Sequence, residues 1–163
     1  MSVEVHPSAH VSELADLEAS TRGTRIVIGA NAYIDSFVKI KPAGGTGDVI
    51  IGEGTFINSG CVIYTGNGVV IGEHCAVAAN CTFASTNHAY ADRFRRITEQ
   101  NFLPSKGGIV LGDDVWIGAN TVLLDGAALG DGCVVGAGAI VRGKLESYGV
   151  YAGSPLRQIG ERT

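Results

Sequence analysis

Histidine is the residue of this chain best suited to acid–base chemistry, and the chain contains four of them. His74 and His88 lie in the middle of the sequence, whereas His6 and His10 lie close to its start. A neutral imidazole can accept a proton from a hydroxyl group near physiological pH, so a well-placed histidine can act as a general base. A zinc site would need three converging histidines, and the central pair has no third beside it. We therefore expect acid–base chemistry and no metal.

A six-residue hydrophobic repeat surrounds these histidines and must position them. It is clear in Ile28-Gly29 with Ile34, and in Leu111-Gly112 with Ile117-Gly118. Val, Ile, Leu or Phe occupies the first position of every hexad, and three hexads make one coil. The coils are 5–22, 28–45, 51–68, 71–88, 111–128 and 129–146. Such a repeat predicts short strands that turn at corners and stack through parallel hydrogen bonds, that is, an all-β solenoid of about six coils.

The four cysteines fit the same repeat, because Cys61, Cys75, Cys81 and Cys133 all fall on the fifth position of a hexad. Most other fifth positions hold small or β-branched residues, so the thiols are expected to be buried fillers of a narrow core. They show no C-x-x-C spacing, and a disulfide framework is not expected in a domain of this size and apolar content.

Three residues depart from that rule at the fifth position, namely Asn67, Asn87 and Leu145. The two asparagines end equivalent hexads of neighbouring coils. Their amides are expected to form a short internal ladder.

The repeat is interrupted four times, always after the third hexad of a coil, at residues 23–27, 46–50, 69–70 and 89–110. The interruptions should therefore emerge from one edge of the solenoid. A loop as long as 89–110 in a compact solenoid is usually functional, and this one begins directly after His88. After residue 146 the rhythm stops, and residues 147–163 are expected to form a short C-terminal cap on a single domain spanning 1–163.

Composition excludes several classes of protein. Hydrophobic residues make up 45% of the chain and charged residues 17%, which argues against disorder. A net charge of −4 gives no electrostatic reason to expect a nucleic-acid partner. No apolar stretch is long enough to cross a membrane, and the N-terminus does not resemble a signal peptide, so we expect a cytoplasmic protein.

Over nearly the whole chain these hexads resemble the left-handed β-helix acyltransferases. Residues 115–120, 135–141 and 152–157 look like segments of the galactoside and maltose O-acetyltransferases. The step Thr86-Asn87-His88, followed by an extruded loop, matches the place of that family's catalytic histidine, and its Asn-His pair also resembles the xenobiotic acetyltransferases. The resemblance implies a left-handed parallel β-helix and a homotrimer with active sites between subunits. It also implies acetyl-CoA as acyl donor, with His88 as general base in a direct transfer.

The resemblance also assigns roles to individual residues. Asn58 matches an acceptor-binding asparagine, and Trp116 matches a tryptophan beside the thioester end of the cofactor. Ala119 and Ala137 match positions whose backbone contacts pantetheine, and Arg157 matches a basic residue near the nucleotide phosphates.

Some family features are missing from this chain. Gly143 and Gly160 stand where the family tends to be basic, and the adjacent Arg142 and Arg162 could substitute for them; Arg142 is taken as a cofactor contact. The acidic acceptor contact near residues 64–66 and the helical N-terminal segment of the galactoside and maltose enzymes are absent. These departures favour a different acceptor. The shorter chain resembles the acetyltransferases that decorate surface polysaccharides or their nucleotide-sugar precursors, which implies a sugar or a sugar-containing precursor of surface polysaccharide as acceptor.

Other functions remain open at this stage. Within the acyltransferases, the alternatives are N-acetylation of an amino sugar nucleotide and acetylation of an antibiotic. Outside them, a zinc-dependent carbonic anhydrase would need three converging histidines, and the central coils of this chain contain only two. A non-catalytic scaffold or ice-binding prism would favour flat, Thr-rich faces rather than a long loop.

Overall fold

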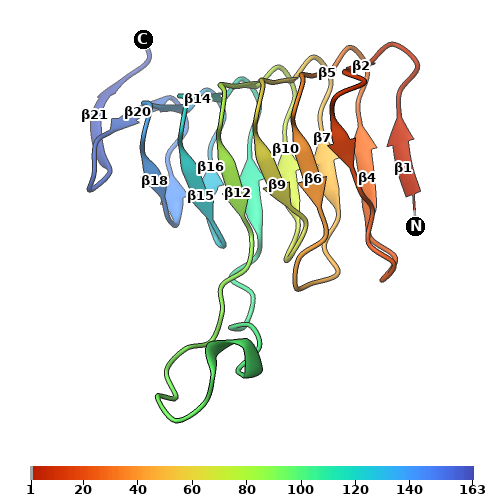
Figure 1. The fold of residues 1–163 in the computed structure, drawn as a ribbon. Coiled ribbons are helices and arrows are strands. Elements are labelled where there is room, and N and C mark those ends of the chain that lie inside the picture. The colour runs from red at the N-terminus through yellow and green to blue at the C-terminus, as the bar shows by residue number, and fades with distance from the viewer. Residues whose placement is uncertain (1) are drawn as a thin grey trace.

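A computed structural model describes residues 2–163 of the protein. Nearly all of its regular structure is β-strand, and the strands wind into a three-sided parallel solenoid (Figure 1). The helical structure among these residues is one 3-10 turn, η1 (Ile97–Glu99). Within the same residues, no helix has the length and apolar character needed to span a bilayer.

Each of the three sheets takes every third strand of the chain up to β20, and β21 is added to the second sheet next to β20. The first sheet contains β1 (Ser2–Val5), β4 (Arg25–Ile28), β7 (Val49–Ile51), β10 (Val69–Ile71), β13 (Ile109–Leu111), β16 (Ala128–Leu129) and β19 (Lys144–Leu145). The second contains β2 (His10–Val11), β5 (Tyr33–Ile34), β8 (Phe56–Ile57), β11 (Ala76–Val77), β14 (Trp116–Ile117), β17 (Val134–Val135), β20 (Gly149–Ala152) and β21 (Arg157–Glu161). The third contains β3 (Asp16–Leu17), β6 (Lys39–Lys41), β9 (Val62–Tyr64), β12 (Thr82–Ala84), β15 (Val122–Leu124) and β18 (Ile140–Val141).

The core forms because parallel, in-register pairing stacks equivalent hexad positions on one another. In the second sheet, for example, Ile57 pairs with Val77 and Val77 with Ile117. These first-position side chains are fully buried, whereas Val5 in the terminal coil is 42% exposed because nothing stacks on its outer side. The all-β, parallel solenoid predicted from the repeat is thus confirmed.

All four cysteines are free and completely shielded inside the prism. Burial raises the pKa of the Cys133 thiol to about 11 and also raises the pKa of Cys75. A raised pKa keeps a thiol protonated, and therefore unreactive, until the pH approaches that value. The Cys61 side chain lowers the pKa of Cys81, so for that thiol burial alone is the protection. Because all four thiols are buried, we expect none of them to react with a disulfide reagent at pH 8 in the native protein, and all four to react after unfolding in guanidinium. A thiol that reacts in the native state would contradict this core.

The structure differs from the hexad register at the C-terminal end. Only Arg142 and Gly143 separate β18 from β19, so the last hexad is shortened and Leu145 reaches the first sheet, where it pairs with Leu129. This explains why a leucine stands where the repeat predicts a small residue. Beyond it, β20 continues the second sheet, and β21 pairs with β20 in antiparallel fashion.

The two asparagines of the predicted ladder have different partners. The Asn67 amide donates to the carboxylate of Asp125 at 3.1 Å, across a sequence separation of 58 residues. The backbone carbonyl of Asn87 accepts the backbone N–H of Leu103 at 2.7 Å, and the Asn87 side-chain amide forms no hydrogen bond with Asn67 within residues 2–163. The predicted amide ladder is therefore not formed, and the Asn67 amide binds Asp125 instead.

The long connection from β12 to β13 projects away from the prism (Figure 1). It leaves from the corner where the chain passes from the third sheet to the first, which we call the loop corner. The passage from the second sheet to the third, which contains Ala119 and Ala137, is called the alanine corner.

Candidate active site

His88 lies at the loop corner, where the chain departs from the prism. Its side chain is exposed, and its backbone forms an antiparallel bridge with Phe102 on the returning part of the loop. Two hydrogen bonds flank the bridge, from the Leu103 N–H to the Asn87 carbonyl at 2.7 Å and from the Ala89 N–H to the Asn101 carbonyl at 3.0 Å. The loop is therefore closed at its base, immediately around the histidine.

The Phe102 ring supports the imidazole from one side. The two ring centroids are 4.6 Å apart, with an interplanar angle of 39°. The same phenyl ring covers Gly44, where an added Cβ would lie 2.5 Å from the ring and where the backbone has a φ of +61°. Only glycine suits that position, and its lack of a side chain lets the ring pack against the prism.

A cavity of about 450 Å³ lies beside this base, between the loop and the later coils. Its lining residues are Asn87, Tyr90, Leu103, Lys106, Leu124, Asp125, Gly126, Arg142 and Gly143. Lys106 and Arg142 form no ion pair within residues 2–163. The cavity next to His88 therefore offers two cationic groups to an anionic ligand.

Three of the predicted cofactor residues lie together at the alanine corner. Ala119 and Ala137 stack in adjacent coils, with the Gly138 N–H donating to the Ala119 carbonyl at 2.8 Å. Within residues 2–163 the N–H groups of Ala119 and Ala137 themselves donate no hydrogen bond. Trp116, 52% exposed, lies just before this corner on the outer face of the second sheet. The corner thus offers small side chains and free amides to an extended ligand.

Asn58 occupies the same corner two coils earlier. Its side-chain amide donates to the Val77 carbonyl at 2.7 Å, which supports the corner itself. The amide N–H used in this bond is therefore engaged within the prism.

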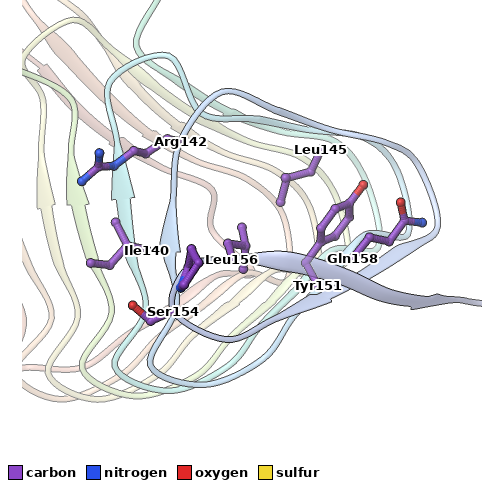
Figure 2. A pocket seen from close by; sticks show the side chains of 8 residues that line it. Ile140, Arg142, Leu145, Tyr151, Ser154, Leu156 and Gln158 are labelled. Carbon is purple, nitrogen blue, oxygen red and sulfur yellow. The ribbon is translucent and has the colours of Figure 1, made fainter.

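The two predicted arginines lie at the C-terminal end of the prism. Arg157, on β21, pairs with Ala152 at the end of β20. Strand β20 stacks on β17, which leads into the alanine corner at Ala137. Arg142 follows β18 and lines a second cavity of about 530 Å³, shown in Figure 2. The other lining residues are Ile140, Leu145, Tyr151, Ser154, Pro155, Leu156 and Gln158.

Within one chain, the predicted site is divided between two corners. His88 lies at the loop corner, whereas Trp116, Ala119 and Ala137 lie at or beside the alanine corner. A strand of the third sheet separates these corners in every coil. Within residues 2–163, no group of three His, Cys, Asp or Glu side chains converges on a possible metal position.

Sequence reasoning missed Phe102 and Asp125. Phe102 is one of several aromatic residues in the loop, and nothing in its spacing distinguishes it from them. Asp125 did carry a signal, because it is a lone carboxylate inside the apolar run 123–129. A charged residue in such a run is expected to have specific hydrogen-bond partners.

Comparison with known proteins places this chain among the hexapeptide acyltransferases. It is 30% identical to galactoside O-acetyltransferase of Escherichia coli K12 over 153 residues, which cover 94% of this chain and 72% of that protein. The chain belongs to the hexapeptide-repeat acyltransferase family. Two family models agree: "Bacterial transferase hexapeptide (six repeats)" matches residues 108–143, and "Hexapeptide repeat of succinyl-transferase" matches residues 48–82.

A second relative of this hexapeptide-repeat chain bears the name of a lipopolysaccharide-biosynthesis O-acetyltransferase of Escherichia coli K12. It is 27% identical, and the match covers 84% of this chain and 69% of that protein.

Two solved structures have a similar fold. A hexapeptide-repeat acetyltransferase of Vibrio cholerae O1 biovar eltor, complexed with acetyl-CoA, matches with a TM-score of 0.72 and 27% identity, over 83% of this chain and 70% of that one. An N-acyltransferase of Bacillus cereus, in complex with dTDP and 3-hydroxybutyryl-CoA, matches with a TM-score of 0.81 over 98% of this chain and 83% of that one. Its identity is 22%, so this likeness concerns the fold alone. Both are consistent with the left-handed β-helix that the family resemblance implies.

Proposed function

We propose that this chain is an acetyl-CoA-dependent O-acetyltransferase whose acceptor is a sugar or a sugar-containing precursor of surface polysaccharide. The observation that carries the proposal is the placement of His88. It is exposed at the closed base of the long loop, beside a cavity lined by the cationic side chains of Lys106 and Arg142, which are unpaired within the described residues. The names of the two relatives, a galactoside and a lipopolysaccharide O-acetyltransferase, support a sugar hydroxyl as acceptor. The acetyl-CoA complex of the Vibrio cholerae relative supports the donor.

In the proposed mechanism the acetyl group passes directly from the thioester to the acceptor. One nitrogen of the His88 imidazole accepts the proton of the acceptor hydroxyl as its oxygen attacks the thioester carbonyl. A backbone N–H at a corner of the prism stabilises the resulting oxyanion. The C–S bond then breaks, and the imidazolium returns its proton to the departing sulfur, so the products are the acetyl ester and CoA.

Acetyl-CoA is proposed to lie along the alanine corner. The free N–H groups of Ala119 and Ala137 suit the amide carbonyls of pantetheine, and the small side chains leave room for it. Trp116 covers the thioester end, and Arg157 and Arg142 lie toward the phosphates. Asn58 contacts the acceptor through its side-chain oxygen, which accepts no hydrogen bond within residues 2–163, while one N–H of the amide binds the Val77 carbonyl.

This arrangement requires more than one copy of the chain. His88 and the alanine corner lie on different edges of one prism, so the proposed homotrimer brings the histidine of one copy to the alanine corner of its neighbour. The site is incomplete in a single chain.

Hybrid oligomers test that arrangement. Co-expression of equal amounts of His88→Ala and Ala137→Trp chains is expected to restore about a quarter of wild-type turnover. Each site takes its histidine from one copy and its alanine corner from the neighbour, and each of these is intact in half of the chains, so about one site in four is complete. As control, His88→Ala mixed with the double variant His88→Ala/Ala137→Trp contains no intact histidine and should stay inactive. A hybrid as inactive as this control would place the whole site in one chain.

The acceptor is tested by measuring CoA release from acetyl-CoA in the presence of sugars, nucleotide sugars, their aminated analogues and antibiotics. Turnover with a hydroxylated sugar is expected to exceed that with the matched amino sugar. Faster turnover of the amino sugar nucleotide, or of an antibiotic, would replace the proposed acceptor by one of these alternatives.

A further inference from the structure

Asp125 is a buried carboxylate that the proposed mechanism does not use. It occupies the turn after β15, is only 6% exposed and accepts three hydrogen bonds. Its Oδ1 accepts the Gly108 N–H at 2.9 Å, and its Oδ2 accepts the Lys106 N–H at 2.9 Å and the Asn67 side-chain amide at 3.1 Å. Two of the three donors are backbone groups of the returning loop. A buried carboxylate with this donor set holds its neighbours in one geometry.

These bonds fasten the segment 103–108, which we call the return limb. The limb ends in Gly108, whose carbonyl accepts the Gly126 N–H at 2.6 Å, while the following Ile109 N–H donates to Gly68 at 3.0 Å. A Cβ on Gly108 would lie 2.4 Å from the Gly68 carbonyl oxygen. The end of the limb is therefore inserted between the corners of the coils before and after the loop.

The contacts around His88 come from the start of the return limb and from the residue just before it. Leu103, at its start, donates to the Asn87 carbonyl, and Phe102, just before it, packs its ring on the imidazole. Only two residues separate Leu103 from Lys106, so a limb fixed at Lys106 restricts where Phe102 can lie.

We propose that Asp125 is a positioning residue for His88, which acts by anchoring the return limb so that Phe102 holds the imidazole in place. This role rests on the proposed function, because a fixed imidazole matters only if the imidazole reacts. The carboxylate form is required. In Asp125→Asn one acceptor oxygen becomes an NH2 group that faces an N–H of the limb, so at least one bond is replaced by a contact between two donors.

The anchor itself can be tested without any acceptor. In Asp125→Asn we expect hydrogen exchange at the Lys106 and Gly108 amides to become about tenfold faster or more. We also expect the His88 imidazole signals in an NMR spectrum to move, because the nearby phenyl ring shifts. If Asp125→Asn does not fold, Lys106→Pro removes one of the same bonds from the loop side, and the same change of the His88 signals is expected.

The matched control is Asp131→Asn. Asp131 also accepts a backbone N–H, from Asp113 at 2.8 Å, but it lies in the turn between β16 and β17 and forms no hydrogen bond with the described residues 89–110 of the loop. This control should leave the His88 signals and turnover unchanged.

For the reaction, kcat of Asp125→Asn is expected to fall on the order of tenfold to a hundredfold, with KM for acetyl-CoA nearly unchanged. Unchanged exchange at Lys106 and Gly108 would overturn the anchor. Faster exchange with unmoved His88 signals, or with wild-type kcat, would overturn the positioning role. If the wild-type protein transfers no acetyl group, the proposed function fails, and the His88 signals still decide whether Asp125 positions the ring.

Discussion

Replacement of His88 by alanine is expected to lower kcat for acetyl transfer by a factor of about a hundred to ten thousand, the usual contribution of a positioned general base. The acceptor hydroxyl would have to lose its proton to water during attack on the thioester. KM for acetyl-CoA should change little, because the His88 side chain makes none of the proposed contacts of the donor. Most of these contacts lie at the alanine corner, and Arg142, which lines the cavity beside His88, is unchanged in this variant. The measurement is steady-state release of CoA, combined with direct binding of CoA to the variant.

The control for this variant is His74→Asn. His74 is a second exposed histidine of the same coil, with a φ of +54° that asparagine tolerates better than alanine. It should retain wild-type turnover. The proposed mechanism fails if His88→Ala keeps near-wild-type kcat, or if both histidine variants lose activity equally.

The hexad rhythm made the core predictable because each position of the repeat has one environment in the stacked coils. Ile57, Val77 and Ile117 are buried for the same reason, and the cysteines fill equivalent places beside them. His88 could be located at the departure of the loop because the interruption of the rhythm begins at the next residue.

The path of the loop could not be predicted, because it depends on contacts between distant parts of the chain. The bond between Asn67 and Asp125 joins residues 58 positions apart, and no local pattern couples them. The same holds for Phe102, which reaches Gly44 only because the loop folds back over an earlier coil. Leu145 was misplaced in the register for a simpler reason: the chain omits two residues at one corner, and a strict hexad count cannot detect that shortening.

The largest expected effect on stability comes from Phe83→Ala. Phe83 is completely buried and is the largest of the fully buried side chains. It lies on β12 and pairs with Ile63 on one side and Leu123 on the other. Removing a buried phenyl ring leaves a cavity and typically lowers the free energy of unfolding by about 3–5 kcal/mol. For a chain of this length that corresponds to a fall in Tm of roughly 6–20 °C.

The matched control is Phe94→Ala in the loop, where the side chain is 90% exposed and the same deletion should change the free energy of unfolding by less than about 0.5 kcal/mol. Guanidinium unfolding followed by circular dichroism measures both variants. Equal midpoints for the two would contradict the core position of Phe83.

The m value of the Phe83→Ala transition tests how tightly the coils are coupled. Each coil contacts only its neighbours, so a cavity at β12 weakens the stacking of β12 against both β9 and β15. If the prism still unfolds as one unit, the midpoint falls while m, which reports the surface exposed on unfolding, stays at the wild-type value. We expect this result, because the buried column through Ile63, Phe83 and Leu123 is continuous and the return limb ties the coil before β12 to the coil after it. A lower m, or separate transitions, would mean that the coils on the two sides of β12 unfold independently.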